Sequence, residues 1–263
     1  MSELTGSLRG RRVLNTRAVH QAAELDALLS ARGALPLAYP CIRIEPPQDC
    51  SALDEALREA VAGGFDWLLL TSVNAVYAIT SRLAALGLGA LPADLHVAAI
   101  GSGTAQAAER QLRLLAGLVP DDARAEALLA AFPQQRGLRV LLPQAELARP
   151  LLARELAERA CLVSPVAYRT LVGSGGVDLR TLLAAGRVDV VALTSPSTAR
   201  NLAARLAPDE VSLRALAAVP VACIGPLTAE AAVQLGSPIV EAREQSLAGL
   251  VDALETLFST LEV

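Results

Sequence analysis

Small polar residues with the chemistry to hold an anion recur at two places in the sequence. The phrases IGSGTAQAA (100–108) and IGPLTAEAA (224–232) each follow a short apolar run and lead into Ala-rich sequence. This pattern predicts a strand, a tight turn and a helix. We expect Thr104 and Thr228 to cap these helices, and Gly101 and Gly225 to let the backbone turn closely at the end of each strand. The start of a helix presents unpaired N–H groups and a partial positive charge, which together favour carboxylate or phosphate groups.

A second pair of phrases predicts two more turns of the same kind. In DWLLLTSVNAVYAI (66–79) and DVVALTSPSTARNL (189–202), an apolar strand again runs into Thr-Ser and then into a helix. Thr71, Ser72 and Ser195 stand at these turns. Because Gly, Thr and Ser end strands and cap helices in many folds, local structure is the simpler interpretation of any single turn.

Arginines accompany a third and fainter pair of segments, one beginning at Arg9 (RGRRVLNTRA) and one at Arg136 (RGLRVLLPQA). Their turns carry Arg17 and Arg149, which would support anion binding at the same edges. The three pairs recur in the same order at nearly one offset. The chain therefore resembles an internal duplication of an α/β half.

The predicted fold class is α/β, because strands alternate with helices in a way that favours parallel sheets with helices on both faces. Proline-bearing extended segments, LPLAYPCIRIEPP (35–47) and LVSPVAYRTLVGSGG (162–176), lie at matching places in the two halves. We expect the chain to cross between two lobes there. A simple division into two consecutive halves is the alternative, and periodicity does not exclude it. The expected ranges are 1–34 with 173–263 for lobe 1, 47–162 for an inserted lobe 2, and 35–46 with 163–172 for the linker strands.

Composition excludes several kinds of chemistry. All 23 basic residues are Arg, so the chain has neither a Schiff-base lysine nor a Walker lysine. The four cysteines and two histidines are scattered, and we expect no metal site. The segment GSGTAQ fails the dinucleotide fingerprint because Gln106 stands where the third Gly belongs.

Charge and hydropathy limit the partners. The net charge of −4 argues against broad nucleic-acid affinity. No apolar run reaches the roughly 20 residues of a membrane-spanning helix, and the first residues lack the apolar core of a signal peptide. We therefore expect a cytoplasmic protein without membrane or nucleic-acid partners.

The ordered set TSVNAV, IGSGTA, VAYRT, TSPS and IGPLTA resembles the uroporphyrinogen-III synthase family of the tetrapyrrole pathway, over about residues 13–257. The resemblance implies two flavodoxin-like α/β lobes joined by a two-stranded linker. It implies a hydro-lyase that cyclises hydroxymethylbilane, a linear tetrapyrrole with eight carboxylates, to uroporphyrinogen III with inversion of ring D and loss of water. It further implies no cofactor, a monomer, and at most transient contact with hydroxymethylbilane synthase, the deaminase that precedes it.

The family's motif tyrosine falls on Tyr168 in VAYRT. The resemblance implies that this neutral hydroxyl donates a hydrogen bond to the departing hydroxyl of the substrate. Packing of an amphipathic ring at the lobe linker is the alternative role. One departure is QAELAR (144–149), where Ala145 replaces a Gly found in many relatives. The resemblance implies substrate-binding roles for Arg17, Thr71, Ser72, Gly101, Thr104, Arg149, Ser195, Gly225 and Thr228.

Two other functions compete with the synthase. One is a non-enzymatic, two-lobed protein that closes on a small anion. Many such binders carry an export signal, which this N-terminus lacks. The other is a regulatory module that senses tetrapyrroles, and such modules often travel with an additional domain.

Overall fold

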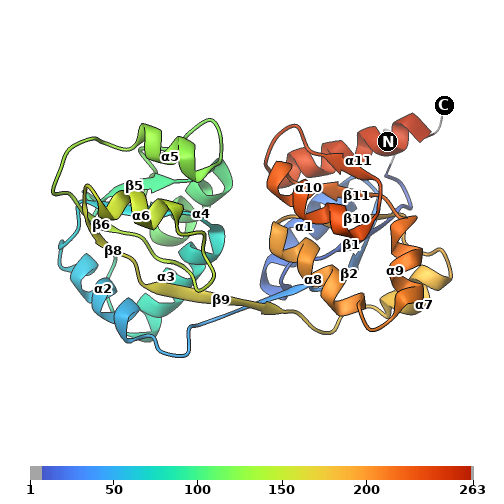
Figure 1. Cartoon of the computed structure of the whole chain (residues 1–263), viewed down its shortest axis with the longest axis horizontal. Coiled ribbons are helices and arrows are strands. Elements are labelled where there is room, and N and C mark those ends of the chain that lie inside the picture. Colours follow the sequence, from blue (N-terminus) through green and yellow to red (C-terminus); the bar gives the residue numbers. More distant parts are fainter. Residues whose placement is uncertain (1–7, 262–263) are drawn as a thin grey trace. The chain divides into compact units, whose positions relative to one another are not determined.

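The computed structural model describes residues 8–261, with the side chains of residues 8–259, and consists of two α/β units (Figure 1). Unit 1 comprises Met1–Arg43 and Leu171–Val263, and unit 2 comprises Ile44–Thr170. Every helix within residues 8–261 is too short or too polar to cross a membrane.

Unit 1 is built on a parallel five-stranded sheet in the order β12-β11-β10-β1-β2. Both faces of the sheet are buried, because alternate strand residues enter two different cores. Val13 and Ala192 pack with residues of α1 and α11, whereas Leu14 and Val191 pack with residues of α7 to α10. The elements are β1 (Arg12–Asn15), α1 (Val19–Ala31), β2 (Leu35–Ala38), α7 (Leu179–Ala184), β10 (Val190–Leu193), α8 (Pro196–Leu206), α9 (Glu210–Ala217), β11 (Val221–Cys223), α10 (Pro226–Ala232), η1 (Val233–Leu235), β12 (Ile239–Glu241) and α11 (Leu247–Leu261).

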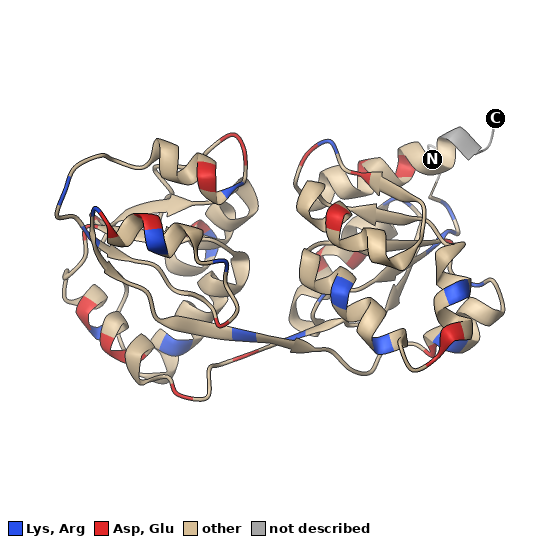
Figure 2. Ribbon diagram, viewed as in Figure 1, with Lys and Arg blue, Asp and Glu red and all other residues tan. Residues whose placement is uncertain are grey.

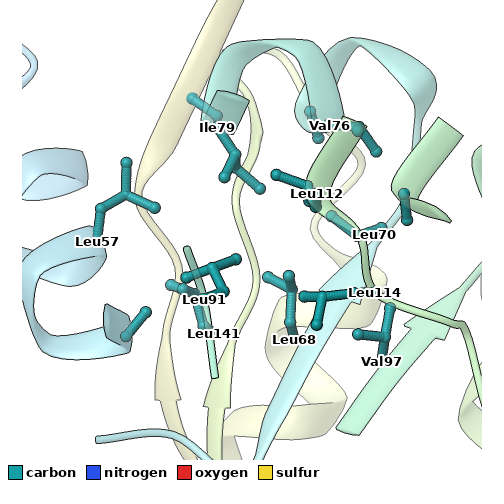
Figure 3. Close-up of a cluster of buried hydrophobic side chains, with 14 of the residues drawn as sticks. Leu57, Leu68, Leu70, Val76, Ile79, Leu91, Val97, Leu112, Leu114 and Leu141 are labelled. Carbon is teal, nitrogen blue, oxygen red and sulfur yellow. The ribbon is translucent and has the colours of Figure 1, made fainter. Parts of the chain in front are cut away.

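Unit 2 repeats this design around a parallel four-stranded sheet in the order β5-β4-β6-β8. Figure 3 shows one of its two cores, where Leu68, Leu70 and Leu141 of the sheet lie among helix residues such as Leu57 and Ile79. The other face packs against α5 and α6. The elements are α2 (Ser51–Val61), β4 (Trp67–Leu70), α3 (Val73–Ala85), β5 (His96–Ala99), α4 (Ser102–Leu112), α5 (Ala125–Ala131), β6 (Arg139–Leu141), α6 (Leu151–Ala157) and β8 (Cys161–Val163).

The predicted fold class, parallel α/β sheets flanked by helices in two lobes, is confirmed. The internal duplication also governs the order of the strands. β11, β10 and β1 take the same successive places in unit 1 as β5, β4 and β6 take in unit 2. However, β1 pairs with β10 and β6 pairs with β4, so each sheet combines strands from both copies of the repeat. This exchange makes unit 1 discontinuous in sequence.

The chain passes between the units through β3 (Ile42–Glu45) and β9 (Val166–Val172), which are neighbours in a three-stranded sheet with β7 (Gln144–Ala145). The expected first linker differs from the observed one. Its first residues form β2, the edge strand of the unit 1 sheet, in register with β1 from Arg12 onward. Leu35 and Leu37 gain a strand partner there, which an extended linker would not supply.

Arg205, near the end of α8, binds the two segments that lead to β3 and away from β9. It donates hydrogen bonds to the carbonyl of Pro40 at 2.6 Å and to the carbonyl of Gly175 at 2.8 Å. Its guanidinium carbon also lies 3.6 Å from the centre of the Tyr39 ring. A Cβ at Gly173 would collide with the Pro40 carbonyl, so the two segments approach closely only because this residue is Gly.

We expect Arg205→Met to lower the free energy of unfolding of unit 1 by about 2–4 kcal/mol, because it removes two charge-assisted hydrogen bonds and a cation–π contact. Denaturant unfolding would measure this. The matched control is Arg214→Met on α9, whose side chain is 84% exposed beside Glu210 and should change stability by about 0.5 kcal/mol or less. Equal losses in the two variants would contradict the role of Arg205.

Candidate functional site

Four strand-to-helix turns lie at the carboxyl ends of parallel strands. In unit 2 these turns connect β4 to α3 and β5 to α4, and in unit 1 they connect β10 to α8 and β11 to α10. Because β4 neighbours β5 and β10 neighbours β11 in their sheets, the two turns of each unit share one sheet edge. That edge is where ligands bind in open α/β sheets.

Ser72 and Ser195 cap α3 and α8 with nearly the same backbone geometry. Their φ and ψ angles are −163° and 155° for Ser72, and −164° and 159° for Ser195. The Ser72 Oγ accepts from the N–H of Ala75 at 3.1 Å, and the Ser195 Oγ accepts from the N–H of Thr198 at 3.2 Å. In α8 the Thr198 hydroxyl also accepts from the N–H of Ser195, which completes a reciprocal capping box.

The prediction that Thr104 and Thr228 cap their helices is wrong. The N-caps are Gly101 and Gly225, and the two threonines lie in the first helical turn. Their side chains turn inward, leaving Thr104 only 6% and Thr228 only 3% exposed. The sequence contained an equally good cap signal three residues earlier, because Gly is also accepted at an N-cap. The expected tight backbone turn at Gly225 is absent, since its φ of 176° is extended, but a Cβ there would lie 2.9 Å from Cγ of Gln245.

The helix starts of the two units differ in the donors that they can offer. α8 and α10 begin with Pro196 and Pro226, which have no N–H. α3 and α4 begin instead with Val73 and Ser102, whose N–H groups are among those that a helix leaves without an intrahelical partner. Unit 2 therefore retains a backbone donor at each helix start that unit 1 lacks.

Tyr168 lies on β9 within unit 2 and reaches the start of α3. Its hydroxyl is 2.9 Å from the Oγ of Ser72. The Tyr168 carbonyl accepts from the N–H of Glu146, and the residue pairs with Ala145 of β7. The ring is only 7% exposed and belongs to the core formed with α2, α3 and α4. Both the backbone and the ring are thus fixed, so the hydroxyl has a defined position.

Burial raises the pKa of Tyr168, and hydrogen bonds with Ser72 and Asn74 offset part of this rise. The phenol is therefore protonated at physiological pH and available as a donor. Asn74 is a further residue at this corner that the motifs did not single out. It stands in the quoted TSVN motif, two residues after Ser72, but nothing in the sequence places it beside Tyr168.

Arg17 follows β1 in a turn that a buried asparagine holds. The Oδ1 of Asn15 accepts from the N–H of Arg17 at 3.1 Å, and its Nδ2 donates to the carboxylate of Asp26 at 2.8 Å. The Arg17 side chain is 11% exposed, with its Nη2 4.0 Å from a carboxylate oxygen of Glu24. Burial lowers the pKa of His20, and the positive charge of Arg17 adds to this effect.

Arg149 lies exposed in the turn after β7, and within the described part of the chain its side chain makes no hydrogen bond or ion pair. Ala145, where the resemblance leads us to expect a Gly, pairs with Tyr168 on β9. The segment QAELAR therefore supports Tyr168 through the backbone.

The structure brings the predicted residues together in groups. Tyr168, Ser72 and Thr71 lie at one corner of unit 2, next to the Gly101 turn. Arg17 lies in unit 1, as do the turns of Ser195 and Gly225. Figure 2 shows acidic and basic positions interspersed along the helices and loops of each unit. Among residues 8–261, no group of three or more His, Cys, Asp or Glu side chains could hold a metal ion.

Comparisons of sequence identify relatives across nearly the whole chain. The model of the family described as "Uroporphyrinogen-III synthase HemD" matches residues 23–252. The uroporphyrinogen-III synthase of Synechococcus elongatus is 34% identical over 256 residues, which cover 94% of this chain and 96% of that protein. A porphyrin biosynthesis protein HemD of Ruminiclostridium josui is 28% identical over 94% of this chain, which spans 48% of the length of that relative.

Solved structures agree with the observed architecture. A mutant uroporphyrinogen III synthase of the bacterium Thermus thermophilus is similar with a TM-score of 0.63 and 25% identity, over 95% of this chain and 100% of that one. A uroporphyrinogen-III synthetase of Helicobacter pylori has a TM-score of 0.56 and 16% identity, over 94% and 99% of the two chains. The second similarity supports the fold.

Proposed function

The chain belongs to the uroporphyrinogen-III synthase family, and from that premise we propose how its residues carry out the reaction. Members of this family are lyases of tetrapyrrole biosynthesis that act on a linear tetrapyrrole. We assign to this chain the cyclisation of hydroxymethylbilane to uroporphyrinogen III, with inversion of ring D and loss of water. The observation that carries the residue assignment is the buried Tyr168 hydroxyl, 2.9 Å from Ser72 at the start of α3.

Tyr168 is the proton donor in this proposal. Its phenol hydrogen-bonds the hydroxyl of the substrate's hydroxymethyl group and gives up its proton as the C–O bond breaks, so that the hydroxyl leaves as water. The methylene carbon left on the first ring is cationic and is attacked by the α-carbon of ring D that already carries the link to ring C. That link then breaks, which leaves a cationic methylene carbon on ring C, and the free α-carbon of ring D bonds to it with ring D inverted. That carbon loses a proton at the end, which restores the phenol. Because hydroxymethylbilane also cyclises unaided to the uninverted isomer, positioning of the rings contributes more than acid strength.

Substrate carboxylates are bound mainly by backbone donors. We propose that the N–H groups of Val73 and Ser102 hold carboxylates at the starts of α3 and α4, with Thr71 and Gly101 shaping those turns. In unit 1 the turns of Ser195 and Gly225 contribute fewer donors. Buried Thr104 and Thr228 support their turns from inside, and Arg17 and Arg149 supply charge. Backbone N–H groups and these arginines can bind a substrate with eight carboxylates although the net charge of the chain is −4.

We further propose a cytoplasmic monomer that meets hydroxymethylbilane synthase only transiently. The reactivity of hydroxymethylbilane supports contact with the preceding enzyme, because a short path between the two enzymes leaves less time for spontaneous cyclisation. No cofactor takes part in the proposed steps, which use only side chains and backbone groups of this chain.

One coupled assay tests the activity. Purified protein is combined with porphobilinogen and its deaminase, the products are oxidised, and chromatography separates type III from type I. We expect type III to dominate, with type I alone when the protein is omitted. A product that remains type I would favour an anion-binding or tetrapyrrole-sensing role for the chain.

The raised pKa of Tyr168 predicts how activity depends on pH. The donor must be protonated, and its pKa lies above the ordinary value of about 10 for a phenol. Activity that depends on this proton is therefore retained up to about pH 10 and lost only as pH rises further. We would measure the kcat of type III formation between pH 7 and 10 on protein shown to remain folded. Over this range, loss of the Tyr168 proton should not lower the kcat, so Tyr168→Phe should not remove any alkaline decrease from the profile. A limb near pH 8 that this substitution removes would contradict the assignment.

A further inference from the structure

We propose that Ser72 is a positioning residue that turns the proton of Tyr168 toward the substrate. This inference rests on the proposed role of Tyr168 as proton donor. Ser72 caps α3 through the N–H of Ala75, and its hydroxyl also meets the Tyr168 hydroxyl 96 positions further along the chain. A cap alone requires only the first of these contacts.

The direction of the hydrogen bond between Ser72 and Tyr168 follows from counting donors. Each hydroxyl has one proton and two lone pairs. One lone pair of the Ser72 Oγ accepts from the N–H of Ala75, and the proton of the Ser72 hydroxyl remains available for donation. If Tyr168 donated to Ser72, its only proton would be unavailable to a substrate. When a substrate accepts from Tyr168, Ser72 must therefore be the donor in the 2.9 Å contact.

The resulting chain runs from the Ala75 N–H to Ser72, from the Ser72 O–H to Tyr168, and from the Tyr168 O–H to the departing hydroxyl. Each bond polarises the next, and the chain begins at the partly positive start of α3. When Tyr168 gives its proton to the leaving hydroxyl, the phenolate keeps the hydrogen bond from Ser72. A proton returns to the phenolate when the closing ring carbon loses its hydrogen, so Ser72 itself exchanges none.

Ser195 offers a built-in comparison for this inference. It caps α8 with nearly the same φ and ψ angles as Ser72, but its hydroxyl and N–H are engaged with Thr198 in the capping box. An alanine at either position removes a helix cap. Only the alanine at Ser72 also removes a partner of Tyr168.

The test compares Ser72→Ala, Ser72→Thr and Ser195→Ala. We expect Ser72→Ala to lower the kcat of type III formation by about tenfold and to raise KM by a smaller factor. Ser72→Thr keeps a hydroxyl in a residue that also caps helices and should restore most of kcat. Protein with ¹³C at the tyrosine Cζ atoms gives three signals, one for each tyrosine, and Tyr168→Phe identifies that of Tyr168. This signal should shift in Ser72→Ala, return toward its wild-type position in Ser72→Thr, and stay in place in Ser195→Ala.

A double variant separates this inference from the assignment of the donor. If Ser72 acts through Tyr168, then adding Ser72→Ala to Tyr168→Phe should cost little further activity, because coupled residues are not additive. An equal further loss in that background would overturn the positioning role. So would a Tyr168 signal that does not move in Ser72→Ala. Wild-type activity in Tyr168→Phe itself would instead overturn the proposed proton donor.

Discussion

Tyr168→Phe should lower the rate of uroporphyrinogen III formation by about ten- to a hundredfold, the scale expected for losing one hydrogen bond in the transition state. The substitution removes a single oxygen. The ring stays in its core beside the start of α3, and the backbone of β9 remains paired with β7. The fold should therefore survive, with the free energy of unfolding changed by about 1 kcal/mol. Type I product should rise because spontaneous cyclisation competes with a slower enzyme.

The matched control for this prediction is Tyr39→Phe. Tyr39 is also buried, but it lies in unit 1 with its ring against the guanidinium of Arg205. Losing its hydroxyl keeps that contact, so the rate and the isomer ratio should stay close to those of the wild type. If both variants turned over at the wild-type rate, Tyr168 would be a packing residue of β9 and another group would supply the proton.

Periodicity was enough to predict the class of the fold. Strands buried on both faces give continuous apolar runs such as WLLL (67–70) and VVAL (190–193), and the turn after each run marks the start of a helix. The repeat also predicted which turns are equivalent. It did not show that Leu35–Ala38 pairs with β1, because an edge strand of four residues with a proline looks like a linker in sequence.

The candidate site was less predictable, because its contacts join distant parts of the chain. Ser72 and Tyr168 were each identified through their motifs, but the hydrogen bond between them depends on how β9, which pairs with β3 and β7, passes the start of α3. Asn74 was missed for the same reason. Thr104 and Thr228 were mistaken for caps since Gly and Thr within one turn give two acceptable cap positions, and only packing decides between them.

Ser102→Pro should raise KM by about tenfold or more while preserving the fold, because it removes one backbone N–H from the start of α4. A hydrogen bond to a charged acceptor is worth about 1.5–3 kcal/mol, which corresponds to this change in affinity. The duplication shows that proline fits here. In the twin phrase, Pro226 occupies the same first helical position after Gly225. Gly101 already has the extended backbone that a following proline requires, with φ of −165° and ψ of 168°.

The informative comparison is Ser102→Pro with Ser102→Ala. Both variants lose the serine hydroxyl, but only proline lacks the N–H, so the difference in KM between them isolates the backbone donor. kcat should change less than KM, since the carboxylate is bound in the ground state and in the transition state alike. Val73→Pro makes the equivalent change at α3, where the twin turn has Pro196, and should act in the same direction. The alanine control for Val73→Pro is Val73→Ala. If both proline variants remained folded and kept the KM of their alanine controls, the helix starts of unit 2 would not bind substrate carboxylates through these N–H groups. Side chains would then have to bind the carboxylates.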